Sequence, residues 1–159
     1  MRKVVVGIGN ILWKDDGVGC HVARVLEGMS VPDVAVVDGG TRPDVLDLFG
    51  EVDKLVIVDA VRAGGLPGQI YRFPLDDLSL GRKSLLSFHD MSLADGLMVM
   101  RSRGEIVEAV VVGVEPKEIA WGLELSPELQ EKIPQIIQVV LSELGATAEP
   151  AMAGKKGGE

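Results

Sequence analysis

The sequence has one cysteine, no long hydrophobic run and no excess of positive charge, and each absence excludes a class of protein. Cys20 is the only thiol in 159 residues, so no disulfide can form within the chain, as is usual in a reducing compartment. No apolar run approaches the ~20 residues of a membrane-spanning helix, and residues 1–8 lack the apolar core of a signal peptide. We therefore expect a soluble, cytoplasmic protein without a membrane partner.

Negative charge predominates along the chain. Its 24 acidic and 16 basic residues give a formal net charge of -8 at pH 7. Proteins that bind nucleic acid use a basic surface to neutralise phosphates, and the sequence contains no basic stripe. The charge therefore excludes nucleic acid as the expected partner and favours a cation or a basic protein surface.

The composition is that of a folded domain. Hydrophobic residues make up 47% of the chain and the mean hydropathy is +0.26, so disorder is not the default. A length of 159 residues suits one domain with a sizeable core. We predict a single domain over residues 1–146. Residues 147–159 lack hydrophobic periodicity, which predicts a disordered tail.

Runs with the apolar pattern of strands alternate with segments of helical spacing. The predicted strands are residues 3–8, 34–37, 54–58, 69–73 (an edge strand that Pro74 stops) and 106–112. The predicted helices are residues 16–29, residues 43–50, a segment from His89 and a long helix capped by Ser126, which Pro134 should kink or break. The alternation predicts a three-layer α/β/α fold, a twisted, mostly parallel sheet of about five strands with helices on both faces.

Acidic residues follow the first three predicted strands. The glycine-rich stretch after the first strand carries the adjacent acids Asp15 and Asp16, and Asp38 and Asp59 follow the next two strands. Because parallel strands end at the same edge of a sheet, we expect Asp16, Asp38 and Asp59 to lie at that edge, where open α/β folds bind ligands. We expect this strand-end site to be exposed.

Two kinds of site can be compared with this constellation. Glycines at 7 and 9 after a strand are typical of dinucleotide-binding loops. However, Leu12 replaces the third glycine, and two acids at the helix N-terminus would repel a pyrophosphate. A divalent metal such as nickel or zinc would suit two carboxylates and an imidazole, which Asp16, Asp59 and His89 supply from separate loops.

Structural roles remain open for several of these residues. Asp15 is expected to cap the helix or to carry a charge on the loop surface. Asp38 and Asp59 could simply fix the turns after their strands. Cys20 is interpreted as a small buried apolar group and left out of the ligand set. Trp13 could contact a partner or pack over the glycine loop.

Six short motifs occur along nearly the whole chain, from about residue 3 to residue 144. They are Gly7-x-Gly9-Asn10-x-Leu12-x-x-Asp15-Asp16-Gly17-x-Gly19, Asp38-Gly39-Gly40-Thr41, Val58-Asp59-Ala60, His89-Asp90, Gly113-Val114-Glu115-Pro116 and Leu125-Ser126-Pro127. In these motifs and their order the chain resembles the hydrogenase maturation proteases.

The resemblance implies a selective endopeptidase with a single α/β/α domain. Such enzymes remove a C-terminal extension from the large-subunit precursor of a nickel-containing hydrogenase after nickel insertion. The family's metal contacts carry over onto Asp16, Asp59 and His89, and Asp38 matches a further family acid, so these four form the predicted catalytic set. Many relatives have Glu at the position of Asp16, which shortens the reach here by one methylene. The expected partner is the nickel-loaded precursor, which brings the nickel with it; no nucleotide cofactor is expected, and the enzyme should be a monomer.

Two mechanisms remain open for the implied hydrolysis. A metal could polarise the peptide carbonyl and activate water, or a carboxylate could act as general base, as in aspartic peptidases. A serine or cysteine triad is not expected because no nucleophile sits in an elbow motif. The alternative function is a non-catalytic nickel-dependent docking protein or metallochaperone, which would use the same three ligands.

Overall fold

A computed structural model of the chain describes residues 1–42, 50–74 and 97–146. Several predictions fall outside these ranges. They are the helix at 43–50 apart from its last residue, the loop at 75–88, residues 89–96 of the helix from His89, and the disordered tail at 147–159.

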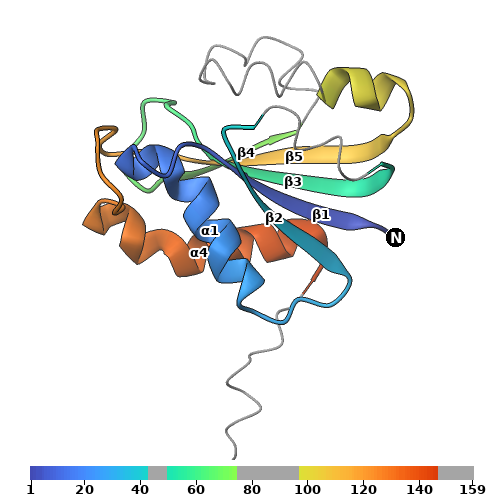
Figure 1. Cartoon of the computed structure of the whole chain (residues 1–159), viewed down its shortest axis with the longest axis horizontal. Helices are drawn as coiled ribbons and strands as arrows, with labels where there is room; N and C mark the ends of the chain where they lie inside the picture. The colour runs from blue at the N-terminus through green and yellow to red at the C-terminus, as the bar shows by residue number, and fades with distance from the viewer. Residues whose placement is uncertain (43–49, 75–96, 147–159) are drawn as a thin grey trace, which may run out of the picture.

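Within these ranges five strands form one sheet, as the sequence predicts. They are β1 (Lys3–Ile8), β2 (Val34–Gly40), β3 (Val52–Ala60), β4 (Ile70–Pro74) and β5 (Ile106–Val114). Their order is β2-β1-β3-β5-β4, and only the β4–β5 pair is antiparallel. The sheet is therefore mostly parallel, with β4 at one edge (Figure 1). At this edge Pro74, which has no N–H, removes no hydrogen bond from the interior of the sheet.

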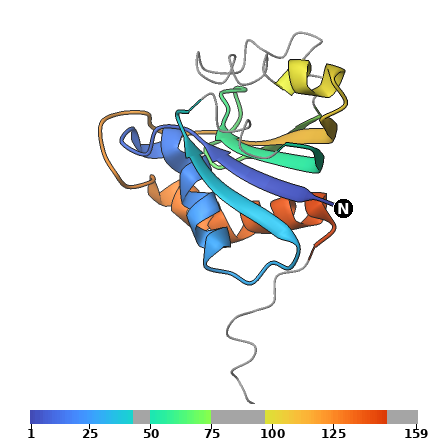
Figure 2. The same cartoon turned by 45° about the vertical axis from the view of Figure 1, so that its right-hand side comes forward.

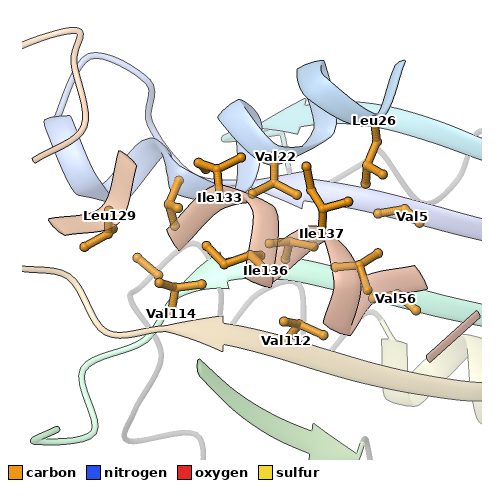
Figure 3. Packing of buried hydrophobic residues seen from close by; sticks show 14 of the residues in the cluster. Val5, Val22, Leu26, Val56, Val112, Val114, Leu129, Ile133, Ile136 and Ile137 are labelled. Carbon is orange, nitrogen blue, oxygen red and sulfur yellow. The ribbon is translucent and has the colours of Figure 1, made fainter. Parts of the chain in front are cut away.

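Helices cover both faces of the sheet, which confirms the three-layer prediction (Figure 2). On one face, α1 (Val18–Glu27) and α4 (Pro127–Leu144) pack their apolar side chains against alternate residues of β1, β3 and β5 (Figure 3). On the other face, Leu97 and Met100 from a short helix at 97–102 join the second core cluster. Burying each such side chain contributes about 1.5–3 kcal/mol relative to exposure, so both layers hold the sheet in place.

The helix after the glycine loop begins later than predicted. A 3-10 turn, η1 (Lys14–Gly17), precedes α1, and Val25 lies 42% exposed rather than on the buried stripe. Gly19 is buried where α1 meets the sheet, and a Cβ added there would overlap the carbonyl oxygen of Val58. Helix backbone and strand backbone are therefore in direct contact next to Asp59.

The long helix α4 is continuous across Pro134, so the predicted break is absent. Pro134 points to solvent, where water can satisfy the carbonyl that its missing N–H leaves unpaired, while Ile133 and Ile136 are buried on the opposite side. Ser126 is the N-cap residue and Pro127 follows at the first turn, but the Ser126 side chain makes no capping hydrogen bond. No helix in the described ranges is long and apolar enough to cross a membrane.

The two ends of the described domain lie together. The Lys3 ammonium, at the start of β1, donates a hydrogen bond of 2.6 Å to the carbonyl oxygen of Leu144 at the end of α4. Gly145 then ends the helix in the left-handed conformation. Both ends therefore lie at the amino-terminal edge of the parallel strands, opposite the edge that carries the acids.

Candidate active site

Gly9 is the point where the acid-bearing loops meet. Its N–H donates to the carbonyl oxygen of Gly40, two residues beyond Asp38, at 3.0 Å. A Cβ at Gly9 would overlap the carbonyl oxygen of Asp16 and lie 3.6 Å from Asp59 Oδ1. With φ at +135°, this position also favours glycine for conformational reasons. The carboxyl ends of β1, β2 and β3 are therefore joined through one residue that has no side chain.

Asp16 is held at this edge by the glycine loop itself. Its Oδ2 accepts a hydrogen bond of 2.9 Å from the Asn10 N–H, and its own N–H donates to the Trp13 carbonyl at 3.1 Å. The Asn10 side chain accepts from the Leu12 N–H at 2.9 Å, which closes the turn. The carboxylate is partly exposed, so it can reach a ligand at the edge of the sheet.

Asp59 ends β3 close to Gly9, but the expectation of an exposed position is wrong. Asp59 is only 2% exposed, and its Oδ1 accepts a hydrogen bond of 2.8 Å from the Ala60 N–H. The packing of β3 between β1 and β5, together with the close approach of α1 at Gly19, covers this strand end. A carboxylate in such a low-dielectric position interacts more strongly with a cation than an exposed one does.

Asp38 lies at the same edge but forms an ion pair with an arginine side chain. Arg24 Nε on α1 donates to Asp38 Oδ2 at 2.8 Å, and the Asp38 side chain is 24% exposed. The pair joins α1 to the end of β2, so Asp38 has a structural function whatever its part in the reaction.

Cys20 lies near Asp38 and Asp59 and is not suited to act as a nucleophile. Its thiol is buried and donates to the Gly9 carbonyl oxygen at 3.4 Å. Burial, followed by the neighbouring Asp38 carboxylate, raises the pKa of the thiol to about 12. The thiol therefore stays protonated at neutral pH, consistent with the prediction that no cysteine triad operates here.

Asp15 is neither a helix cap nor a surface charge, which corrects the prediction. It is fully buried, and its Oδ2 accepts hydrogen bonds of 2.9 Å from the N–H groups of Lys117 and Glu118 and from the Ser126 hydroxyl. Its Oδ1 accepts from the Ser126 N–H at 2.8 Å. We call Asp15 with these four bonds the Asp15 anchor: it ties the loop between β5 and α4 to the glycine loop (Figure 1).

Glu115 forms a second buried anchor that sequence reasoning missed. Its Oε1 accepts hydrogen bonds from the Ala63 N–H at 2.9 Å, the Gly65 N–H at 3.1 Å and the Tyr71 hydroxyl at 2.6 Å. Burial alone would raise the pKa of Glu115, but the Tyr71 hydroxyl and the two N–H groups outweigh it and lower that pKa below its usual value. The signal available in the sequence was position, because Glu115 stands in one of the motifs quoted above without an assigned role.

The complete predicted ligand set cannot be followed in the structure, because His89 lies outside the described residues. Within residues 1–42, 50–74 and 97–146, no group of three His, Cys, Asp or Glu side chains is arranged to hold a metal ion. Asp59 Oδ1 and the Asp16 backbone carbonyl lie beside Gly9, and the Asp16 carboxylate is held by the next residue, Asn10. Carboxylates at one edge of a sheet can contact a divalent cation or hold a water for attack on a peptide carbonyl.

Comparison with known proteins gives this edge a context. A family model described as "Hydrogenase maturation protease" matches residues 20–143. A putative hydrogenase maturation protease of Methanocaldococcus jannaschii is 33% identical over 148 residues, covering 89% of this chain and 95% of the relative. The hydrogenase 2 maturation protease of Escherichia coli is 32% identical over 151 residues and covers 91% of both chains.

The fold agrees with a solved structure. The hydrogenase maturating endopeptidase HybD from Escherichia coli superposes with a TM-score of 0.87 at 30% identity, over 96% of this chain and 99% of that one. Sequence, fold and the matched region thus agree, and the chain belongs to the hydrogenase maturation protease family, a family of peptidases.

Proposed function

We propose that the protein is an endopeptidase that removes the C-terminal extension of a nickel-loaded hydrogenase large-subunit precursor. The observation that carries the proposal is the meeting of Asp16 and Asp59 at Gly9, from two different loops, at the carboxyl edge of the sheet. This contact, together with the hydrogen bond from Asn10 to the Asp16 carboxylate, holds two acidic residues near each other in a chain of this family, and carboxylates suit a divalent cation carried by the substrate.

In this proposal the nickel belongs to the substrate. Asp16, Asp59 and His89 contact it, so that only a loaded precursor places its cleavable peptide correctly. Asp16, with partial exposure and one oxygen held by Asn10, is suited to orient the approaching metal or water. A carboxylate at this edge then accepts the proton of the attacking water as the peptide carbonyl becomes tetrahedral, and the protonated group gives that proton to the leaving amine as the C–N bond breaks.

Asp38 has a supporting part in the proposal. Its ion pair with Arg24 fixes the end of β2 against α1, and the Gly40 carbonyl that follows holds Gly9. The position of Gly9 in turn sets the separation of the two predicted metal contacts. Asp38 is therefore proposed as a positioning residue for the glycine loop.

The decisive experiment is incubation of the purified protein with a large-subunit precursor, with and without nickel, followed by mass spectrometry. Loss of a single C-terminal fragment from the loaded form alone is the expected result. Binding of the loaded precursor without any cleavage would instead assign the protein as a docking protein or metallochaperone.

Selectivity provides a second check. Because recognition depends on a metal carried by one kind of substrate, casein and unrelated peptides should remain intact after prolonged incubation. Rapid cleavage of an unrelated protein would contradict the proposal that the enzyme cuts only a substrate that carries nickel.

A further inference from the structure

Four exposed apolar side chains gather beside the candidate active site. Trp13 and Leu12 on the glycine loop are 41% and 42% exposed, and Trp121 and Leu123 on the loop between β5 and α4 are 71% and 63% exposed. The two indole rings meet edge to face, with centroids 5.7 Å apart and an interplanar angle of 87°. These four residues, which include both tryptophans of the chain, are called the aromatic patch.

The patch is built on a fixed backbone. The Lys14 N–H donates to the Gly122 carbonyl at 2.9 Å, and the Gly122 N–H donates to the Leu12 carbonyl at 2.8 Å. These bonds pair the two loops as in a short parallel ladder, and the Asp15 anchor holds the same loops from below. The exposed rings are therefore presented by rigid loops rather than by freely moving ones.

Stability does not account for this exposure. An edge-to-face ring contact contributes only about 0.5–1.5 kcal/mol, and it leaves most of the Trp121 surface in water. Single exposed apolar residues are common on protein surfaces, and Val25 and Val99 are examples here. A group of four with two tryptophans is typical of a binding surface, because tryptophan is enriched among the residues that dominate interface energy.

The distance to the candidate site determines which partner would cover the patch. Trp13 is three residues from Asp16, so their Cα atoms are at most about 11 Å apart. A protein interface of standard size buries roughly 800 Å² per partner, a disc of roughly 16 Å radius. A folded protein with a segment at Asp16 would therefore also cover the aromatic patch.

We propose that the aromatic patch docks the hydrogenase large-subunit precursor through apolar side chains that flank its cleaved segment. The charges around the patch fit an apolar partner surface: Lys14 pairs with Glu118 at 3.0 Å and Lys117 pairs with Glu128, so the rim carries neutralised ion pairs. This inference rests on the proposed function, since it takes the same substrate. It adds a docking surface beside the acids, and this surface determines the affinity for the precursor rather than the chemistry of cleavage.

The test compares two alanine variants. Trp121→Ala removes the most exposed ring of the patch, and Val99→Ala is the control, since Val99 is 48% exposed on the short helix at the far end of the molecule (Figures 1 and 2). With nickel-loaded precursor, Trp121→Ala should raise KM at least tenfold and leave kcat within twofold, while Val99→Ala changes neither. Val99→Ala should melt like the original protein, and Trp121→Ala should lose no more than about 2–6 °C, the effect of the lost ring contact, so that both variants are folded at the assay temperature. An unchanged KM for Trp121→Ala would overturn the proposal.

Two further outcomes are decisive. If the original protein does not cut the precursor, the proposed function fails. Calorimetric binding of the precursor then decides the docking proposal alone: Trp121→Ala must weaken the Kd at least tenfold, and an unchanged Kd overturns it. If sedimentation shows a dimer that Trp121→Ala converts to a monomer, the patch is the contact of a second copy and the docking proposal is overturned.

Discussion

Two neighbouring aspartates, Asp15 and Asp16, have opposite surroundings. Asp15 is fully buried and accepts four hydrogen bonds from the loop between β5 and α4. Asp16 is partly exposed, and within the described residues Oδ2 of its carboxylate accepts one hydrogen bond, from the Asn10 N–H of its own loop. The 3-10 turn separates the two directions, sending one side chain into the protein and the other to the edge of the sheet.

The difference shows how one sequence feature can supply both a scaffold and a site. A carboxylate that is saturated by donors is committed to structure, because moving it would leave several buried N–H groups unpaired. A carboxylate with few internal donors remains available to an external ligand. Four experiments test this difference between the two aspartates and their surroundings, from the largest expected effect to the smallest.

The largest effect should come from Gly9→Ala, which disturbs both aspartates at once. The added methyl overlaps the Asp16 carbonyl and the backbone has φ at +135°, so the free energy of unfolding should fall by at least about 3 kcal/mol. Cleavage of precursor should be lost as well. Gly64→Ala is the control: it has φ at +87° but open space around it, so only about 1 kcal/mol should be lost. Urea denaturation measures both, and equal losses would refute the steric explanation.

Asp15→Asn should break the structural side of the comparison. Asparagine has one accepting oxygen where four donors now converge, so we expect a loss of about 2–4 kcal/mol in the free energy of unfolding. Asp16→Asn should change it by about 0.5 kcal/mol or less. Chemical denaturation of the two variants side by side gives the contrast. Similar stabilities would mean that the Asp15 anchor contributes little.

Asp16→Asn and Asp59→Asn should break the functional side. Under the proposed function each substitution removes a negative charge that contacts the nickel of the substrate. We expect cleavage to fall at least about 100-fold, equivalent to about 2.7 kcal/mol of transition-state stabilisation. Initial rates with nickel-loaded precursor are the measurement, and a melting curve should show that Asp16→Asn is folded. Rates equal to those of the original protein would exclude metal recognition by these carboxylates without affecting the family assignment.

The smallest effect concerns how stability depends on pH through His21, which lies near Leu123 on the loop between β5 and α4. Burial, followed by the Arg24 charge, lowers the pKa of His21 below 6.5, and Nε2 has no hydrogen-bond partner among the described residues. The unfolded chain therefore binds the proton more readily, so stability should be complete above about pH 6.5 and decrease as the pH falls below it. Urea midpoints at pH 7.5 and 5.5 should show a larger decrease for the original protein than for His21→Gln. A larger decrease in the variant would reverse the assigned direction.

The fold was largely predictable because its signals are local. Five apolar runs mark the five strands, and the alternation with helices places Asp16, Asp38 and Asp59 at one edge. The edge position of β4 followed from Pro74. These inferences need only residue patterns a few positions long together with the rule that parallel strands share an edge.

The surroundings of the individual acids were not predictable, because they depend on distant residues. The partners of Asp15 lie 102 to 111 residues away in the sequence, so nothing near it indicated burial. The exposure of Asp59 was misjudged because strand order and the close contact at Gly19 cover it. Pro134 was expected to disrupt α4, but the buried isoleucines on the opposite side stabilise a continuous helix. The roles assigned to Asp16, Asp38, Asp59 and His89 stay predictions.

The hydrogen bond between Lys3 and Leu144 has a practical consequence for handling the protein. It brings the start of β1 and the end of α4 to one end of the described domain, while the acids and the aromatic patch lie at the other end. A tether attached ahead of β1 would therefore orient the protein on a sensor chip with the end that carries the acids facing the flow. Immobilisation in this way leaves the whole docking face open to a bulky analyte.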